Sequence, residues 1–307
     1  DYTIDISEHC PYEWVEIDGR VCKKLADQEE SASENYAKVN RHVPIDAELA
    51  WCLGLWFADG SQSIDKYKKP NGIRITLGID DVEIAERWLD CMKSKFNVGG
   101  NYYLTKRTPD SLGRLGSWTS VNLNSLAIGH WFAAKFGVGC KVKSLPEFLL
   151  NLPKPIAKAF LEGFMLGDGS IKKGGICVTS LANLELCLGL YNLTLKLGLK
   201  STLNLHTKPG ALATVKHVRT LTISNWTEGG PGEVGGRSGI IFDGLMYRRI
   251  KTITKLTHNE TVWDLTVAED HSFSVAGVVV HNCFGSYTED SMNGIINHVT
   301  EQSRLTW

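Results

Sequence analysis

Apolar residues recur at helical spacing in two short stretches of the chain, and each stretch ends in the tripeptide Asp-Gly-Ser. The first covers residues 50–61 and the second covers residues 160–170. A lysine-containing turn, a strand-like alternation of apolar and polar residues, and a longer amphipathic pattern follow each of them. Spacings of three and four indicate helices and a spacing of two indicates strands, so both stretches predict a helix that leads into a hairpin and a second helix.

The same order of elements recurs after each Asp-Gly-Ser. In the first half the expected elements are a strand at 73–77, a helix at 81–96, and strands at 102–104 and 118–123. In the second half they are a strand at 176–179, a helix at 181–199, and strands at 201–206 and 218–224. The repeat predicts an α+β fold with two antiparallel sheets, each with one face covered by helices and the other face open.

Composition fits a globular protein of about two domains. The 307 residues are 43% hydrophobic and 22% charged. The chain lacks an apolar run of about 18 residues and the residue order of a signal peptide, so we expect neither a membrane partner nor Sec export. The 8 cysteines form no C-x-x-C pair, which excludes a zinc ribbon or thioredoxin-like motif and favours a reduced, cytoplasmic location.

A net charge of −1 conceals a strong local asymmetry. Residues 1–50 hold 12 acidic and 5 basic side chains, whereas residues 171–225 hold 7 basic and 1 acidic. Local positive charge suits a phosphate-binding surface, although scattered solvated lysines explain the charge equally well. The cationic side chains expected on the open sheet faces and their turns, where they would contact double-stranded DNA, are Arg74, Lys106, Arg107, Arg114, Lys172, Lys173, Lys208, Lys216 and Arg219.

Asp59 and Asp168 are expected at the C-terminal ends of the two Asp-Gly-Ser helices, each before a glycine suited to a left-handed cap. Small residues recur four positions apart on one face of each helix, namely Gly54 with Ala58 and Gly163 with Gly167. Close packing of those faces would bring two mutually repelling carboxylates together, which a divalent cation such as Mg²⁺ would stabilise. A single Asp-Gly would more simply end a helix, but two copies in matching contexts favour the metal site.

These stretches resemble the duplicated motif of LAGLIDADG (DOD-type) homing endonucleases. Residues 161–169 match the motif along their whole length, and residues 52–60 keep its Gly, Leu and Ala-Asp-Gly positions. The resemblance covers about residues 44–226. It implies a pseudo-twofold αββαββα repeat that binds DNA as a monomer. It also implies Mg²⁺-dependent cleavage of both DNA strands, in which Asp59 and Asp168 are the catalytic residues and also bind the metal.

Lys143 lies in Lys-Ser-Leu-Pro, which is similar to the family's Lys-x-hydrophobic-Pro segment before the second motif. The resemblance implies a lysine that assists near the scissile phosphate. An ordinary surface lysine is the competing interpretation, and for the second half Lys216 is only a guess.

A glycine-rich stretch at 228–239 separates the repeat from a region with strand patterns at 240–242, 250–256, 261–267 and 272–280. This region ends in His281, Asn282 and Cys283. Together with Asp264 and His271 it resembles the C-terminal splicing blocks of inteins, which implies a small all-β, Hint-type segment at 240–282. Inteins commonly carry an inserted LAGLIDADG endonuclease, so the two resemblances support each other.

The residue types at this junction suit protein splicing. The side-chain amide of Asn282 can attack its own backbone carbonyl and break the following peptide bond, while His281 polarises that carbonyl or protonates the leaving amine. The thiolate of Cys283 can accept the upstream segment. The resemblance implies that Asp264 and His271 tune this thiol and donate protons.

The start of the chain departs from the intein pattern. Asp1 stands where inteins have Cys or Ser, and the only Thr-x-x-His is Thr214 to His217, inside the second predicted sheet. We therefore expect a fragment that needs an N-terminal splicing half as partner, with residues 1–43 as an acidic lead-in and remnant of that half. The endonuclease would occupy residues 44–227.

Residues 283–307 would belong to the host protein. Their Cys-Phe-Gly-Ser-Tyr start resembles the stretch after an active-site cysteine in ribonucleotide reductase large subunits, with an unrelated host at equal weight. The alternatives to an active intein endonuclease are a catalytically inactive DNA-binding relic, in which the aspartates only end helices, and a fragment of the host enzyme.

Overall fold

The computed structural model describes residues 2–24, 39–67, 69–106, 117–173, 175–206 and 218–224, with short pieces at 240–242, 245–247, 250, 252, 267, 272–275 and 278–281. Two compact units divide the chain, Asp1–Arg249 and Ile250–Trp307. Among the described helices, none combines the length and apolar character needed to cross a membrane.

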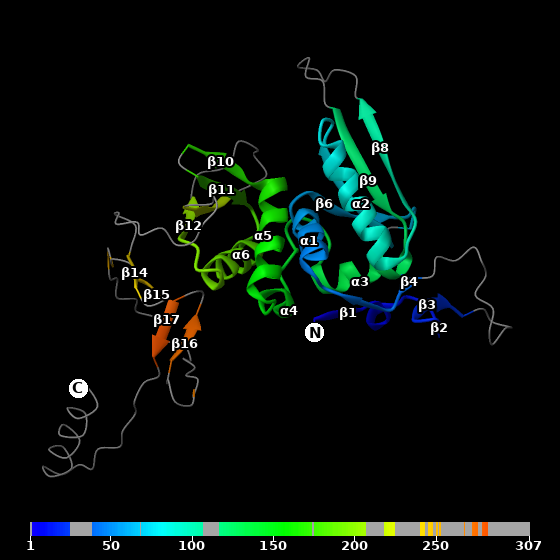
Figure 1. The fold of residues 1–307 in the computed structure, drawn as a ribbon, viewed down its shortest axis with the longest axis horizontal. Coiled ribbons are helices and arrows are strands. Elements are labelled where there is room, and N and C mark those ends of the chain that lie inside the picture. The colour runs from blue at the N-terminus through cyan, green and yellow to red at the C-terminus, as the bar shows by residue number, and fades with distance from the viewer. Residues whose placement is uncertain are drawn as a thin grey trace, which may run out of the picture. The chain divides into compact units, whose positions relative to one another are not determined.

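The first half of the repeat begins with helix α1 (Ala47–Asp59), whose N-cap Asp46 accepts a 2.9 Å hydrogen bond from the backbone NH of Leu49. An antiparallel sheet follows, in the order β6-β7-β9-β8. Its strands are β6 (Gly60–Ile64), β7 (Pro70–Gly78), β8 (Gly100–Lys106) and β9 (Ser117–Leu123). Helices α2 (Val82–Phe96) and α3 (Leu126–Phe136) cover one face, where Ile73, Ile75 and Val121 are fully buried (Figure 1).

The second half repeats this order, as predicted. After the short helix α4 (Glu147–Leu150), its elements are α5 (Lys154–Asp168), β10 (Ser170–Lys172), β11 (Ile176–Leu181), α6 (Leu184–Lys196), β12 (Ser201–His206) and β13 (Val218–Ile223). The strand order β10-β11-β13-β12 matches that of the first sheet.

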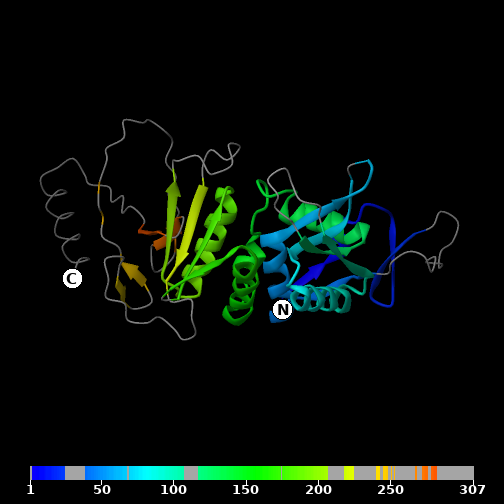
Figure 2. The ribbon, with the colours of Figure 1, turned by 90° about the horizontal axis from the view of Figure 1, so that it is seen from above.

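Helices α1 and α5 pack backbone to backbone between the two sheets (Figures 1 and 2). A Cβ atom on Gly54 would lie 2.0 Å from the carbonyl oxygen of Phe160, and one on Gly163 would lie 2.0 Å from that of Trp51. No larger side chain fits at either position without moving a helix. The close helix contact expected from the small-residue spacing is therefore confirmed.

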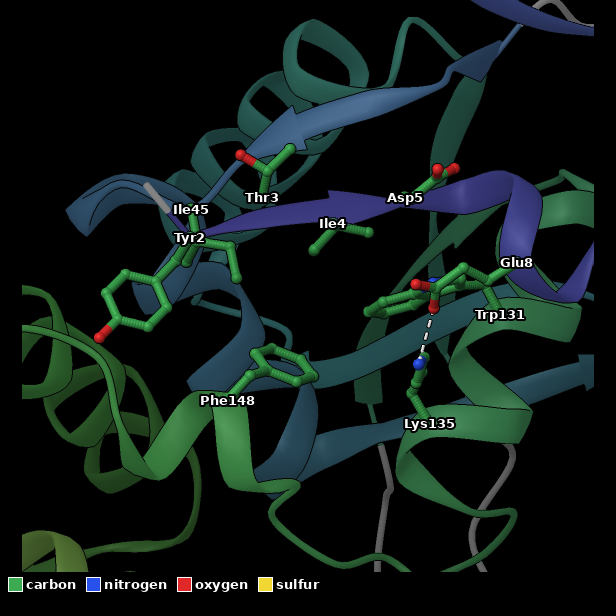
Figure 3. A pocket seen from close by; sticks show the side chains of 9 residues that line it. All are labelled: Tyr2, Thr3, Ile4, Asp5, Glu8, Ile45, Trp131, Lys135 and Phe148. Atoms are coloured by element: carbon green, nitrogen blue, oxygen red, sulfur yellow. Dashed lines mark ion pairs between the residues drawn. The ribbon is translucent and has the colours of Figure 1, made fainter.

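The N-terminal residues pack against this repeat. Strand β1 (Thr3–Asp5) pairs with β5 (His42–Pro44), the 3-10 turn η1 (Ile6–His9) follows β1, and β2 (Trp14–Ile17), β3 (Arg20–Lys23) and β4 (Val39–Asn40) form a separate small sheet. Ile4 and Ile6 join the same core as α1. Figure 3 shows β1 and η1 bordering a pocket with Trp131 and Lys135 of α3, where Lys135 forms a 2.7 Å ion pair with Glu8.

Beyond the repeat, the described residues form two hairpins. One joins β14 (Ile240–Phe242) to β15 (Leu245–Tyr247) in the first unit, and in the second unit β16 (Ser272–Val275) pairs with β17 (Val278–His281). The single strand predicted over 272–280 is thus two strands, because Ser272–Val275 pairs antiparallel with Val278–His281. Nearly all of 250–267 and all of 283–307 lie outside the described residues.

Candidate functional site

Two aspartates meet where α1 and α5 end. A Cβ on Gly167, the residue before Asp168, would lie 2.6 Å from Oδ2 of Asp59, so the Asp59 carboxylate rests over the last turn of α5. Burial raises the pKa of Asp59 to about 6, and repulsion from Asp168 contributes. Asp168 is more exposed, and its pKa is also raised by desolvation, against the opposing charge of Lys143. The two ionised carboxylates are therefore partly desolvated and close together, which is unfavourable unless a cation neutralises them.

The glycines after the aspartates do not form the left-handed caps that we expected. Gly60 has φ −85° and Gly169 has φ −90°, both extended. The reason for glycine is space, since a Cβ on Gly60 would lie 2.2 Å from the carbonyl oxygen of Trp56, and one on Gly169 would lie 2.3 Å from that of Met165. Each glycine lets the chain pass directly from a helix into a strand.

Lys143 is buried, with 3% of its surface exposed, so the interpretation as a surface lysine is wrong. Its Nζ donates hydrogen bonds to the carbonyl oxygens of Trp56 (2.9 Å), Phe57 (3.1 Å) and Gly60 (2.7 Å) at the end of α1. It also lies 4.4 Å from the centre of the Trp56 ring. Desolvation lowers the pKa of Lys143 to about 8, although the charges of both aspartates favour the protonated form. The ammonium therefore caps α1 beside the carboxylate pair.

The open sheet faces carry part of the expected cationic set. Arg74 of β7 and Lys172 of β10 lie on these faces, and Lys173 is exposed in the turn after β10. Lys106 ends β8, where its backbone pairs with Ser117. The remaining expected contacts fall outside the described residues, namely Arg107, Arg114, Lys208 and Lys216.

Arg219 was expected on the open face, and this prediction is wrong. Side chains alternate along β13, and Leu221, two residues on, is fully buried on the helix side. Arg219 shares that side, and its Nη1 donates a 2.5 Å hydrogen bond to the carbonyl oxygen of Ala182. Because Arg219 lies near the end of β13, its charged side chain can lie on the helix-covered face, where the other side chains of the strand are apolar.

One further acidic residue near the site was not anticipated. The charge of Asp81 contributes to the raised pKa of Asp59. Its Oδ2 accepts a 3.0 Å hydrogen bond from the backbone NH of Gly78 in the turn between β7 and α2. The sequence contained only a weak signal for it, an aspartate at the start of a predicted helix.

The residues expected to splice the chain are mostly outside the described part. His281 ends β17, and its backbone pairs with Ser272 of β16. Asp264, His271, Asn282 and Cys283 lie outside the described residues. Of the five residues expected to take part in splicing, the structure therefore describes only the backbone of His281.

The carboxylate pair fits a divalent cation only in part. Within the described residues, no cluster of three or more His, Cys, Asp or Glu side chains is arranged to hold a metal ion. Two carboxylates supply hard oxygen ligands whose mutual repulsion a cation would relieve. Mg²⁺ is usually held in this way, by one or two protein carboxylates with phosphate oxygens and waters completing its shell.

Comparison with known proteins gives a family match in the second half of the repeat. Residues 155–225 match the LAGLIDADG-like domain family. Over 270 residues the chain is 24% identical to a DNA polymerase of Thermococcus hydrothermalis. This alignment covers 80% of this chain and 15% of the polymerase. A DNA polymerase of Thermococcus litoralis is 22% identical over 264 residues, or 76% of this chain and 14% of that protein. The chain thus spans only about a seventh of the length of these relatives.

Solved structures of homing endonucleases show a looser likeness. I-DmoI in complex with DNA and Mn is 17% identical with a TM-score of 0.43, covering 59% of this chain and 91% of that one. I-WcaI bound to its DNA recognition sequence is 16% identical with a TM-score of 0.41, covering 59% and 77%.

Proposed function

We propose that the chain is a site-specific, metal-dependent DNA endonuclease that cleaves both strands, with Asp59 and Asp168 as its catalytic carboxylates. The observation that carries this proposal is the pair of aspartates held against each other at the ends of α1 and α5. The two helices pack closely and each leads into a sheet with an open face. Open sheet faces on both sides of a carboxylate pair suit a double-stranded substrate.

Asp59 and Asp168 would hold a divalent cation, Mg²⁺ being the expected one. Such an ion supplies Lewis-acid stabilisation of charge on the phosphate and favours ionisation of water. The chain's own residues prepare the site: Asp59 must lose its proton, which requires a pH above about 6, and the nearby charge of Lys143 favours that ionisation. Lys143 also fixes the end of α1, so it acts on the carboxylates through the helix.

Hydrolysis is balanced without a covalent enzyme intermediate. Water forms the new P–O bond, the bond from phosphorus to one deoxyribose oxygen breaks, and that oxygen takes up a proton. Lys172 of β10 and Lys173 in the following turn would orient the duplex, because cations bind phosphates at fixed places without reading sequence.

The relatives agree with an inserted element. A segment that matches most of this chain and only about a seventh of a polymerase is the length expected of an intein-borne endonuclease within a longer host. For this chain we propose a host in which Cys283 follows the insertion, and the resemblance of residues 283–307 makes a ribonucleotide reductase large subunit one candidate, with an unrelated host at equal weight.

Cleavage of plasmid DNA tests the nuclease. The whole chain, incubated with Mg²⁺ and a plasmid that carries the uninterrupted host sequence, should linearise the plasmid, and EDTA should stop the reaction. Asp59→Asn and Asp168→Asn should each abolish cleavage but retain DNA binding, since a metal ligand is lost without loss of the surface. Wild-type cleavage by either variant would overturn the assignment. Binding without cleavage by the unaltered chain would instead identify an inactive relic.

A second activity, peptide cleavage at Asn282, is supported by the intein-like junction and by the hairpin that ends at His281. The side-chain amide nitrogen of Asn282 would bond to its own carbonyl carbon, and the peptide bond to Cys283 would break. The amine of Cys283 would leave with a proton from His281 or His271, and the proton lost by the amide nitrogen would restore that histidine. Complete splicing would also need an upstream thiol or hydroxyl, which an N-terminal splicing half would supply as a partner.

Mass spectrometry of the incubated chain tests this activity. A peptide that begins at Cys283 should be released slowly, and Asn282→Ala should stop its release because alanine has no amide nitrogen. Cys283→Ala should allow release but prevent ligation. Release from Asn282→Ala at the normal rate would show ordinary proteolysis.

A further inference from the structure

The two open sheet faces differ in the row of side chains that starts two residues after each aspartate of the carboxylate pair. Strand register aligns the first-sheet row across β6, β7, β9 and β8 as Ser61, Arg74, Asn122 and Asn101. At the positions related by the repeat, the second-sheet row across β10, β11, β13 and β12 is Ser170, Val178, Thr222 and Thr202. Each row begins with the serine two residues after an aspartate of the pair.

Both rows lie on the faces that the helices leave open. Each residue of a row alternates with side chains on the helix side, such as Ile73 and Ile75 beside Arg74, and Cys177 beside Val178, all of them fully buried. None of the row residues is itself buried. The two rows are therefore equivalent in place and different in chemistry.

The first row presents hydrogen-bonding groups that match purine edges. The Nε of Arg74 is enclosed and has no hydrogen-bond partner among the described residues. An arginine in a DNA groove pairs with O6 and N7 of guanine, and an asparagine pairs with N6 and N7 of adenine. Arg74 stands directly opposite Asn122, which in turn stands opposite Asn101.

The second row offers methyl groups instead. Val178 carries only methyls, while Thr222 and Thr202 each combine one methyl with a hydroxyl. Methyl groups in the major groove contact the C5-methyl of thymine, and a hydroxyl bonds to several bases. In the next row on the side of the aspartates, past the starts of β6 and β10, Thr76 and Ser120 correspond to Ser180 and Thr220, so at these four positions both sheets carry hydroxyls.

We propose that the two half-sites of the DNA target differ in the bases that these two rows contact. The first sheet selects a guanine- or adenine-containing half-site through Arg74, the main specificity-determining residue, and the second sheet selects a thymine-rich half-site with weaker discrimination. This inference rests on the proposed function, because it requires DNA to lie across both open faces.

Selection from a random DNA library tests the inference without cleavage. The whole chain, without divalent metal, is used to enrich bound duplexes, which are then sequenced. One half of the enriched site should specify guanine and the other half should favour thymine. In Arg74→Val the guanine preference should fall about ten- to a hundredfold. Val178→Arg should create a guanine preference at the related position of the other half-site.

Arg87→Val is the matched control, because Arg87 is exposed on α2 and packs 4.0 Å from the centre of the Trp51 ring, away from the open faces. Its enriched sequence should equal that of the unaltered chain. Equal base preferences in the two half-sites, or an unchanged site in Arg74→Val, would overturn the inference, as would the absence of any enriched sequence. Asymmetric enrichment by a chain that never cleaves DNA would support it and reject only the nuclease. If Arg74→Val fails to fold, the Val178→Arg result decides.

Discussion

At the scale of single residues, the Asp59 carboxylate weakens the fold that holds it. Its pKa is 3.8 in an unfolded chain and about 6 in the folded protein. The folded state binds this proton more tightly than the unfolded state. The contribution of Asp59 to the free energy of unfolding is therefore complete below pH 3.8 and is lost as the pH rises through about 6. Without divalent metal, Asp59→Asn should raise the free energy of unfolding at pH 7.5 by about 1 kcal/mol, after allowance for solvent screening. Thermal melts measure this change.

The same substitution should have much less effect at pH 3.5, where Asp59 is mostly protonated in both states. Asp90→Asn, at an exposed position of α2, is the matched control and should leave the melting temperature unchanged at both pH values. Mg²⁺ should narrow the gap at pH 7.5 by stabilising only the unaltered chain. A destabilised Asp59→Asn at pH 7.5 would mean that this carboxylate makes favourable contacts.

Lys143 also permits a test in which stability and activity are read separately. Lys143→Met keeps the length of the side chain but leaves the carbonyls of the last turn of α1 without their donors, so we expect a loss on the order of 3 kcal/mol. Hydrogen exchange of the backbone amides at the end of α1 should also quicken. Lys141→Met, in the same loop but exposed, should change neither. Lost cleavage with unchanged stability would assign Lys143 to direct phosphate contact.

The sequence identified the aspartate pair because the motif occurs twice, but it could not show where the Lys143 ammonium binds. Its partners are 83 to 87 residues away along the chain. Arg219 was assigned to the wrong face of its sheet for a related reason. The alternation of apolar and polar residues along a strand does not show which face the helices cover at the end of that strand.

At the scale of elements, periodicity predicted the helices and strands of the repeat closely. The helix expected at 181–199 occupies 184–196, because Asn183 accepts a 3.2 Å hydrogen bond from the backbone NH of Leu186 and so begins it. The glycines at the helix ends were assigned to the wrong conformation. A glycine at a helix end is explained equally well by a left-handed cap and by a backbone too crowded for a Cβ atom, and only the packed structure distinguishes the two reasons.

The approach of α1 to α5 sets the distance between the carboxylates, so it can be tested by adding one methyl group. Gly163→Ala places a Cβ 2.0 Å from the carbonyl oxygen of Trp51, which forces the helices apart and should cost about 1–3 kcal/mol. Cleavage should fall more than DNA binding, because the sheets remain intact. Gly99→Ala, where a Cβ would meet nothing within 4 Å, is the control. Unchanged cleavage in Gly163→Ala would separate catalysis from helix spacing.

At the scale of the whole molecule, the repeat predicted both halves, but no pattern predicted the role of the first 43 residues. Their acidity suggested a lead-in outside the endonuclease. In the structure, the apolar side chains of Ile4, Ile6, Val39 and Val43 join the core around α1. The hydroxyl of Tyr2 also donates a 2.6 Å hydrogen bond to the carbonyl oxygen of Asn151, after α4. Short, irregular strands lack the periodicity that would have revealed these contacts.

If the N-terminal segment is part of the folded nuclease, one of its buried side chains should matter as much as a core residue of the repeat. Ile6 is fully buried, whereas Ile64, on β6, is 52% exposed. Ile6→Ala should lower the free energy of unfolding by about 2–5 kcal/mol through lost burial and the cavity left behind, and Ile64→Ala should change it by less than about 0.5 kcal/mol. Denaturant unfolding of the whole chain measures both. An equally small effect of the two substitutions would return residues 1–43 to the status of a detachable lead-in, because a segment that stabilises the repeat cannot lose a fully buried isoleucine without cost.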